Sequence, residues 1–255
     1  MNESIQRMAL EIADVLGPDA HSVWLYGSVV LGDFHLGWSD IDFIAFSNAP
    51  ISQSQAEGLL DLRQRLSARY PDNPYFRCFE GVTVCLREYL TGSYTRLVYW
   101  GTSGQRVTDR YQRDVFAQME LAKFGRRVYG QGERGIFSVP DRAEIVAAIR
   151  HHLRAIRSCA AETDESLYAC GWLLDIARCM YTLRYGEVIG KTQAGQWALG
   201  EHVFPNEAAL QKTLTVRRHP LQYKDDPQIR AWLKTLGPTV QQYADVLEKE
   251  LKIQG

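Results

Sequence analysis

Hydrophobic residues recur at both helical and strand spacings in the first half of the chain. Ile5, Met8 and Ile12 lie three or four positions apart, which is typical of the buried face of an amphipathic helix, and Gly17-Pro18 is a stop signal. Short runs rich in Val, Ile, Phe and Trp are bounded by Gly, Ser or Asn and predict strands. In chain order the predicted elements are a helix over 3–16, strands over 23–26 and 41–46, a helix over 54–69, a strand over 79–86 and a helix over 111–124.

Helical spacing dominates the second half. Asp141, followed three residues later by Glu144, predicts an N-cap with a capping box that opens an apolar stripe. The helices expected after this one cover 165–185, start near Thr192 and follow Pro238.

A glycine-rich stretch separates the two halves. Residues 125–135 run up to Pro140 and are predicted to contain the domain boundary, and residues 130–135 are interpreted as a surface linker. We therefore predict an α+β fold, with an α/β head over 1–138, built on a mixed sheet with flanking helices, and an α-helical bundle over 139–255.

Composition narrows the class of protein. Lys and Arg number 29 against 30 Asp and Glu, so the formal net charge is −1 and gives no sign of a nucleic-acid-binding protein. No apolar run approaches the roughly 18 residues of a membrane span, and the chain starts with neither a basic nor an apolar leader segment. We expect a cytoplasmic protein with reduced cysteines, because the five cysteines form no C-x-x-C pair.

Two glycine-rich patterns look like phosphate-binding motifs but lack the required context. The G-x-G-x-x-G of residues 130–135 follows a predicted helix and leads to Pro140, whereas a dinucleotide site lies between a strand and a helix. The G-x-x-x-G-K-T of residues 186–192 has one residue too few between its glycines for a P-loop. A helix cap followed by a new helix explains it, and Lys191 at that N-terminus is a candidate phosphate ligand.

The segment that carries chemistry follows the first predicted strand. Asp40 and Asp42 stand two apart at the start of a strand, so their side chains leave the same face and two carboxylates converge. Their mutual repulsion favours a bound cation, and carboxylate oxygens are ligands that Mg²⁺ accepts. Upstream, Gly27-Ser28 predicts a tight turn whose free N–H groups and hydroxyl suit a phosphate. The sequence therefore predicts a metal site beside a phosphate site.

With Ser39, these residues form the arrangement G-S-x10-S-D-x-D. It resembles the nucleotidyltransferase superfamily with a polymerase-beta-like head, and more narrowly the aminoglycoside nucleotidyltransferases of the streptomycin/spectinomycin adenylyltransferase group. A second stretch, residues 173–199 with Ala177-Arg178, Lys191 and Gln196-Trp197, is similar to that group's C-terminal helical domain. The resemblance spans both halves of the chain.

The resemblance implies transfer of an adenylyl group from ATP to a hydroxyl of a small molecule held in a cleft between the domains. An aminoglycoside-type acceptor, and hence antibiotic resistance, follows from it, as do two Mg²⁺ ions between the aspartates and the triphosphate. By the same resemblance, Asp40 and Asp42 are the metal ligands. The resemblance also implies triphosphate contacts from the head at Gly27, Ser28 and Ser39, and from the helical domain at Arg178 and Lys191. It matches the tyrosine on the nucleotide side to Tyr223, across a different spacing.

The third carboxylate departs from the family pattern, in which a strand carries glutamate, an apolar residue and threonine, and the glutamate is the general base. Here the strand reads Phe79-Glu80-Gly81-Val82-Thr83. If Thr83 keeps its register, Gly81 stands at the base position and Glu80 faces the other side. A bulge at Gly81 would return Glu80 to the site, and we predict Glu80 as the base. Otherwise a neighbour such as Glu133, or water, accepts the proton, or the chain does not catalyse this reaction.

Two alternatives remain open. In the first alternative, Gly81 stands at the base position, and the chain is a nucleotide-binding regulator or pseudo-enzyme that binds ATP without turnover. The pair Arg217-Arg218 and the basic stretch 106–113 favour a nucleotidyltransferase that acts on a macromolecule such as tRNA or a protein.

Overall fold

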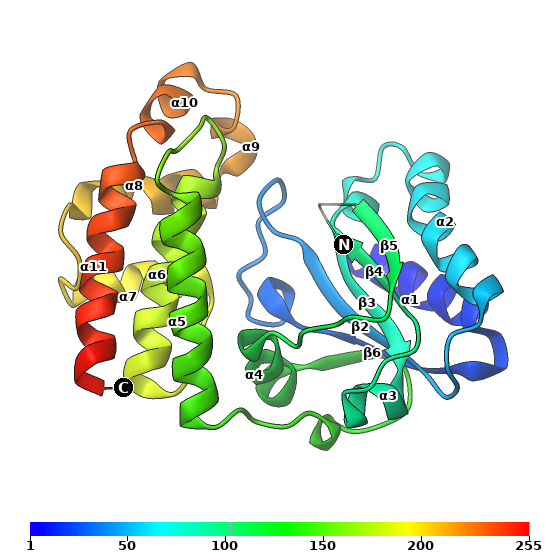
Figure 1. Cartoon of the computed structure of the whole chain (residues 1–255). Coiled ribbons are helices and arrows are strands. Elements are labelled where there is room, and N and C mark those ends of the chain that lie inside the picture. The colour runs from blue at the N-terminus through cyan, green and yellow to red at the C-terminus, as the bar shows by residue number, and fades with distance from the viewer. Residues whose placement is uncertain (102–103, 255) are drawn as a thin grey trace. The chain divides into compact units, whose positions relative to one another are not determined.

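The structure, a computed structural model, describes residues 1–101 and 104–254 and divides into two units (Figure 1). The head unit consists of Met1–Leu31 and Ser39–Val139. The helical unit consists of the chain from Pro140 onward together with the short segment Gly32–Trp38. The division is therefore not a single cut, because a piece of the G-S-x10-S-D-x-D motif belongs to the helical unit.

The head unit is built on a mixed sheet in the strand order β5-β4-β3-β2-β1-β6. Strands β2 and β3 are parallel, whereas the other neighbouring pairs are antiparallel. The strands are β1 (Ala20–Leu25), β2 (Ile41–Ser47), β3 (Phe79–Cys85), β4 (Leu97–Gly101), β5 (Gly104–Thr108) and β6 (Arg126–Gly130), and the helices are α1 (Asn2–Leu16), α2 (Gln53–Arg69), α3 (Leu86–Thr91) and α4 (Val115–Phe124).

Apolar side chains cover both faces of this sheet. On one face Phe43 packs edge-to-face on Trp100, whose indole Nε1 donates to the carbonyl of Leu59 in α2 (3.0 Å). Helices α1 and α2 contact strands β1 and β4 respectively (Figure 1). On the other face Ile44 and Val82 form a core with residues of α3 and α4. This second face is also the face of Asp42, because side chains alternate along β2.

The glycine-rich stretch was the least well predicted part of the head. Residues 126–130 form the edge strand β6, which pairs with β1, and Gly130 lies opposite Ser22. The sequence analysis did not predict this strand. Helix α4 is also shorter than expected, because Asp114 caps it by accepting from the N–H of Ala117 (2.9 Å).

The helices predicted for the helical unit are present, but those over Glu207–Arg218, Pro220–Tyr223 and Pro227–Leu233 were not predicted. Asp141 and Glu144 form the expected capping box at the start of α5. Gly186, in the left-handed conformation (φ 67°), ends α6, as the stop signal predicted. The helices are α5 (Arg142–Cys159), α6 (Tyr168–Tyr185), α7 (Lys191–Gly200), α8 (Glu207–Arg218), α9 (Pro220–Tyr223), α10 (Pro227–Leu233) and α11 (Gly237–Gln254). Within the described residues, no helix combines the length and apolarity that a membrane crossing requires.

A buried ion pair holds the segment Gly32–Trp38 in the helical unit. Arg217 of α8 donates from Nη2 to Oδ2 of Asp33 (2.7 Å) and to its carbonyl (3.2 Å), and the two side chains are only 2% and 6% exposed. The Oδ2 of Asp33 also accepts from the backbone N–H of Thr192 in the first turn of α7 (3.1 Å). The guanidinium lies 5.2 Å from the ring centroid of Trp38. One carboxylate thus caps α7, neutralises Arg217 and fixes the loop.

Replacing Arg217 with Met should lower the free energy of unfolding of the helical unit by about 3–5 kcal/mol, because Asp33 then stays buried without its counter-charge. Urea unfolding followed by circular dichroism measures the change. The neighbouring exposed Arg218 provides the control, since Arg218→Met should cost less than about 0.5 kcal/mol. Equal losses in the two variants would contradict the role given to the Asp33–Arg217 pair.

Candidate functional site

The turn after β1 lies directly against the Asp42 side chain. Gly27 has φ 68°, a conformation that L residues rarely adopt. A Cβ on Gly27 would overlap the Oδ2 of Asp42 and lie 2.7 Å from its Cγ. Glycine is therefore required here for two reasons, the backbone angle and the close approach of a carboxylate.

Hydrogen bonds connect this turn to both aspartates. The N–H of Tyr26 donates to the carbonyl of Asp42 (3.1 Å), and the hydroxyl of Ser28 donates to the carbonyl of Asp40 (3.3 Å). The N–H of Gly27 donates to Oε2 of Glu120 in α4 (3.1 Å). The expectation of a free N–H at Gly27 was therefore wrong. A phosphate oxygen at this N–H has to displace the glutamate.

Glu120 is a site residue that the sequence analysis missed. It is 4% exposed and stands between Met119 and Leu121 on a helix that packs on the sheet. A carboxylate inside an apolar helix face is unusual unless a donor meets it, and this placement was the available signal. Its charge and that of Asp42 contribute to raising the pKa of Tyr26, although burial is the largest cause.

The parallel register of β2 and β3 places Glu80 beside Asp42. Asp42 pairs with Glu80 and Phe43 with Gly81 along an unbroken register, so Glu80 shares the face of Asp42. The bulge at Gly81 that we expected to be necessary is absent from this pairing. Gly81 lies on the opposite face, where a Cβ would be 2.7 Å from Cδ1 of Phe43. Close strand packing thus explains the glycine, and the argument for a pseudo-enzyme loses its structural basis.

Tyr99 of β4 holds the Glu80 carboxylate. Its hydroxyl donates to Oε1 of Glu80 at 2.6 Å, and its ring lies where a Cβ on Gly101 would be 2.5 Å away. The guanidinium of Arg106 covers the ring at 4.2 Å from its centroid. Burial, the bond to Glu80 and the charges of Glu80 and Asp40 raise the pKa of Tyr99 to about 12. The phenol therefore stays protonated and acts as a donor at neutral pH.

The carboxylates of this site suit a magnesium ion that also binds a phosphate. Among residues 1–101 and 104–254, no group of three or more His, Cys, Asp or Glu side chains is arranged to hold a metal ion on its own. Enzymes commonly hold Mg²⁺ by one or two carboxylates, and water and substrate phosphates supply the other ligands. Asp40 and Asp42 match this kind of site, whereas they do not match a closed protein cage.

The two predicted cations of the helical unit converge on one carboxylate. Asp175 of α6 accepts from Nη2 of Arg178 (3.1 Å) at Oδ1 and from Nζ of Lys191 (3.0 Å) at Oδ2. Burial raises the pKa of Asp175, and the charges of Lys191 and Arg178 outweigh it, so the pKa is lowered overall. The structure therefore brings together Arg178 and Lys191, the two triphosphate contacts predicted for the helical unit.

Other candidate residues lie elsewhere. Tyr223 lines a depression with Lys212, Thr215 and Ile229, none of which belongs to the Arg178–Lys191 group. Glu133, the alternative base, is exposed before a short turn. Ser39 is 9% exposed and begins the return of the chain to the head unit.

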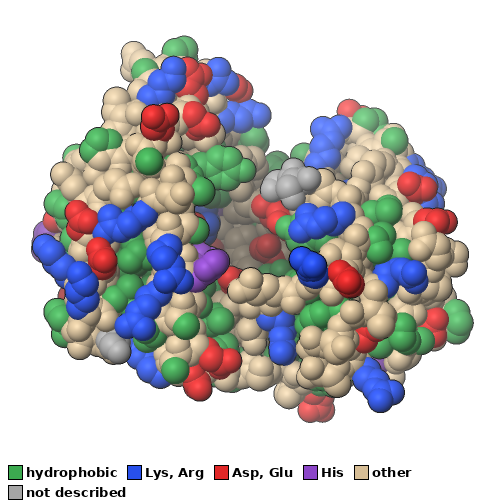
Figure 2. Space-filling model, viewed as in Figure 1, with side chains coloured by type: hydrophobic (Ala, Val, Ile, Leu, Met, Phe, Trp, Pro, Cys, Tyr) green, Lys and Arg blue, Asp and Glu red, His purple; other side chains and the backbone are tan. Residues whose placement is uncertain are grey.

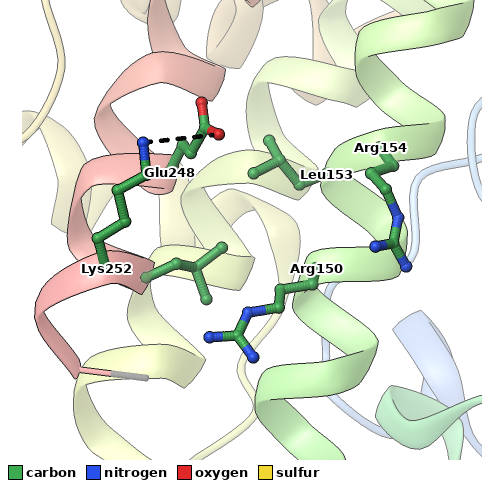
Figure 3. A pocket seen from close by; sticks show the side chains of 6 residues that line it. Arg150, Leu153, Arg154, Glu248 and Lys252 are labelled. Atoms are coloured by element: carbon green, nitrogen blue, oxygen red, sulfur yellow. Dashed lines mark ion pairs between the residues drawn. The ribbon is translucent and has the colours of Figure 1, made fainter.

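The arginine pair that favoured a macromolecular acceptor is only partly exposed. Arg217 is buried on Asp33, so the pair Arg217-Arg218 offers only one exposed cation, and this support for a macromolecular acceptor was wrong. Basic side chains do gather over α5 and α11 (Figure 2). There Arg150, Arg154 and Lys252 line an open depression in which Lys252 lies 3.9 Å from Glu248 (Figure 3). None of the predicted site residues lines it.

Comparison with known proteins matches each half of the chain to a known domain. Residues 7–73 match the nucleotidyltransferase domain, and residues 136–232 match the C-terminal domain of aminoglycoside adenylyltransferases. The chain therefore combines a nucleotidyltransferase domain with a C-terminal domain of the aminoglycoside adenylyltransferase type. This confirms the resemblance that the G-S-x10-S-D-x-D arrangement and the second stretch indicated.

Two similar proteins are named as spectinomycin adenylyltransferases. Over 214 residues the chain is 24% identical to the spectinomycin 9-adenylyltransferase of Staphylococcus aureus, an alignment that covers 78% of this chain and 77% of that protein. The fold matches the crystal structure of spectinomycin adenyltransferase AAD(9) from Enterococcus faecialis with ATP and spectinomycin, at a TM-score of 0.64 and 16% identity, over 96% of this chain and 98% of that one. The match confirms the α+β fold class, with a mixed-sheet head and a helical region.

The close approach of Gly27 to Asp42 can be tested with a second glycine. Gly17 also has positive φ (59°), but a Cβ at Gly17 would have nothing within 4 Å. Gly17→Ala should therefore cost only the backbone penalty of about 1–3 kcal/mol. Gly27→Ala should cost about 1–3 kcal/mol more, because Asp42 has to move. Urea unfolding of both variants measures the difference, and equal losses would contradict the packing described here.

Proposed function

We propose that the chain transfers an adenylyl group from ATP to a hydroxyl of a small molecule, with an aminoglycoside-type antibiotic as acceptor. The observation that supports this most is the in-register pairing of Asp42 with Glu80 beside the Gly27 turn. That arrangement offers a metal-binding carboxylate and a candidate general base on one face of one sheet.

The proposed roles in the head unit follow from chemistry. Asp40 and Asp42 would hold Mg²⁺, which would supply positive charge to the phosphates and to the oxygens of an in-line displacement at the α-phosphorus. Glu80 accepts the proton of the acceptor hydroxyl as its oxygen bonds to phosphorus and pyrophosphate leaves. Tyr99 keeps the carboxylate of Glu80 in place by donating to one oxygen, which leaves the other oxygen for the proton.

The remaining residues bind the triphosphate in this proposal. Gly27, Ser28 and Ser39 lie along the motif around the aspartates, and a phosphate oxygen would replace Glu120 at the N–H of Gly27. Arg178 and Lys191 supply positive charge from the helical unit. Tyr223 is proposed for the nucleotide side on the resemblance alone.

The acceptor class rests on the relatives. The similar proteins named for spectinomycin support an acceptor of that kind, and therefore a role in antibiotic resistance. Acceptor pockets vary within a family more than the catalytic residues do, so the acceptor is what the experiment has to identify.

An acceptor screen tests this proposal directly. The purified chain is incubated with ATP, Mg²⁺ and each of a panel of aminoglycosides, spectinomycin and lincosamides, and pyrophosphate release and product mass are measured. We expect an acceptor-dependent product heavier by one adenylyl group. ATP binding without any product would instead support the regulator alternative, and no ATP binding would contradict the proposal as a whole.

Asp42→Asn should lower turnover in this assay by about 1000-fold or more while the fold persists, because the metal loses a charged ligand. Asp61→Asn, an exposed aspartate of α2, removes the same charge from the head unit and should leave turnover unchanged. Glu80→Gln should lower kcat strongly, whereas Glu133→Gln should not. The reverse order for the two glutamates would make Glu133 the base.

Tyr99→Phe should lower kcat about tenfold and leave KM for ATP unchanged, because in this proposal the phenol acts only by orienting the base. Steady-state kinetics on the acceptor found in the screen measure both constants. Tyr129→Phe on the edge strand β6 is the matched control and should have no effect. An unchanged kcat in Tyr99→Phe would mean that Glu80 does not need this bond.

A further inference from the structure

The group around Asp175 combines features that an ordinary surface ion pair lacks. Arg178 lies about one turn after Asp175 on α6, whereas Lys191 is the first residue of α7. Each cation meets a different oxygen of the same carboxylate, at 3.1 and 3.0 Å. The side chains are partly exposed, at 23% for Asp175, 17% for Arg178 and 27% for Lys191. A small anion can therefore reach the group from solvent.

Lys191 stands where a helix disfavours a cation. The N-terminus of a helix carries partial positive charge and is stabilised by anions. A lysine at this position is therefore compensated only when an anion lies beside it. Two carboxylates play this part in the structure, since Asp33 accepts from the N–H of Thr192 and Asp175 accepts from the lysine itself.

These two carboxylates differ in how firmly they are held. Asp33 is 6% exposed and is fixed by the buried Arg217. Asp175 is more exposed and is held through the two cations that the proposed function assigns to phosphate. Of the two, Asp175 is the anion that an incoming phosphate can replace.

We propose that Asp175 occupies the phosphate seat of Arg178 and Lys191 when nucleotide is absent, and that it lowers the affinity of this seat for pyrophosphate and triphosphate. The inference rests on the proposed function in taking Arg178 and Lys191 as phosphate ligands. Its consequence is a site that remains neutralised when empty and releases pyrophosphate readily after transfer. Asp175 then determines affinity and takes no part in the chemical step.

Pyrophosphate binding without metal isolates this seat from the aspartates of the head unit. Isothermal titration calorimetry with sodium pyrophosphate in EDTA buffer should show that Asp175→Asn lowers the dissociation constant about tenfold. The substitution keeps the shape of the side chain and removes a negative charge that repels pyrophosphate at close range. The dependence of binding on salt should also become steeper. Circular dichroism checks that the variant is folded.

Asp245→Asn is the matched control, because Asp245 is also an ion-paired aspartate of the helical unit, on Arg157 at 2.7 Å. It makes the same change in net charge and should leave pyrophosphate binding unchanged. If Asp175→Asn weakens binding or leaves it unchanged, Asp175 orders the cations or plays no part, and the inference is wrong. If Asp245→Asn and Asp175→Asn tighten binding equally, net charge explains the effect and the inference is also wrong.

Lys191→Ala and Arg178→Ala separate this inference from the proposed function. Both should weaken pyrophosphate binding, and in each background the gain from Asp175→Asn should shrink, since the charges are coupled. If both weaken binding but Asp175→Asn does not tighten it, only the inference about Asp175 fails. If neither affects binding, the assignment of these cations to phosphate fails and the inference fails with it.

Discussion

The in-register parallel pairing of β2 with β3 is the constraint on which the chemistry of the head unit depends. It puts Asp42 and Glu80 side by side on one face, and alternation along each strand leaves the opposite face to Phe43 and Gly81. A slip of one residue would exchange the two faces. The Gly27 turn can approach Asp42 only because it lacks a Cβ, so backbone packing on both sides determines where the carboxylates lie.

Several of the hydrogen-bond donors that are proposed to bind phosphate are paired with buried or half-buried carboxylates in this structure. Glu120 accepts from the N–H of Gly27, and Asp175 accepts from Arg178 and Lys191. Asp33 plays a different part, because its pairing with Arg217 is buried and fixes the motif loop in the helical unit. The protein thus satisfies these anion-binding groups internally, which avoids leaving desolvated donors without partners.

Patterns of apolar residues predicted helices α1, α2, α4, α5, α6, α7 and α11 and strands β1, β2 and β3, because their buried faces repeat every 3.6 or 2 residues. Helix α8 and strand β4 were missed although both have buried residues. Strand β5 was missed since its side chains are largely exposed, and β6 since Arg126 and Arg127 hide its strand character. The aspartate pair was found from local spacing. Glu120, Tyr99 and Asp175 were not, because their partners lie far along the chain and only the fold brings them together.

We propose above all that the face of the sheet that carries Asp42 and Glu80 promotes attack of an acceptor hydroxyl on the α-phosphorus of ATP. The most direct measurement follows the label of ATP carrying radioactive phosphorus at the α position, with Mg²⁺ and an acceptor identified by the screen. The account predicts that the label moves to the acceptor and that unlabelled pyrophosphate is released. Label that stays with released ADP, or that becomes attached to the protein itself, would contradict it.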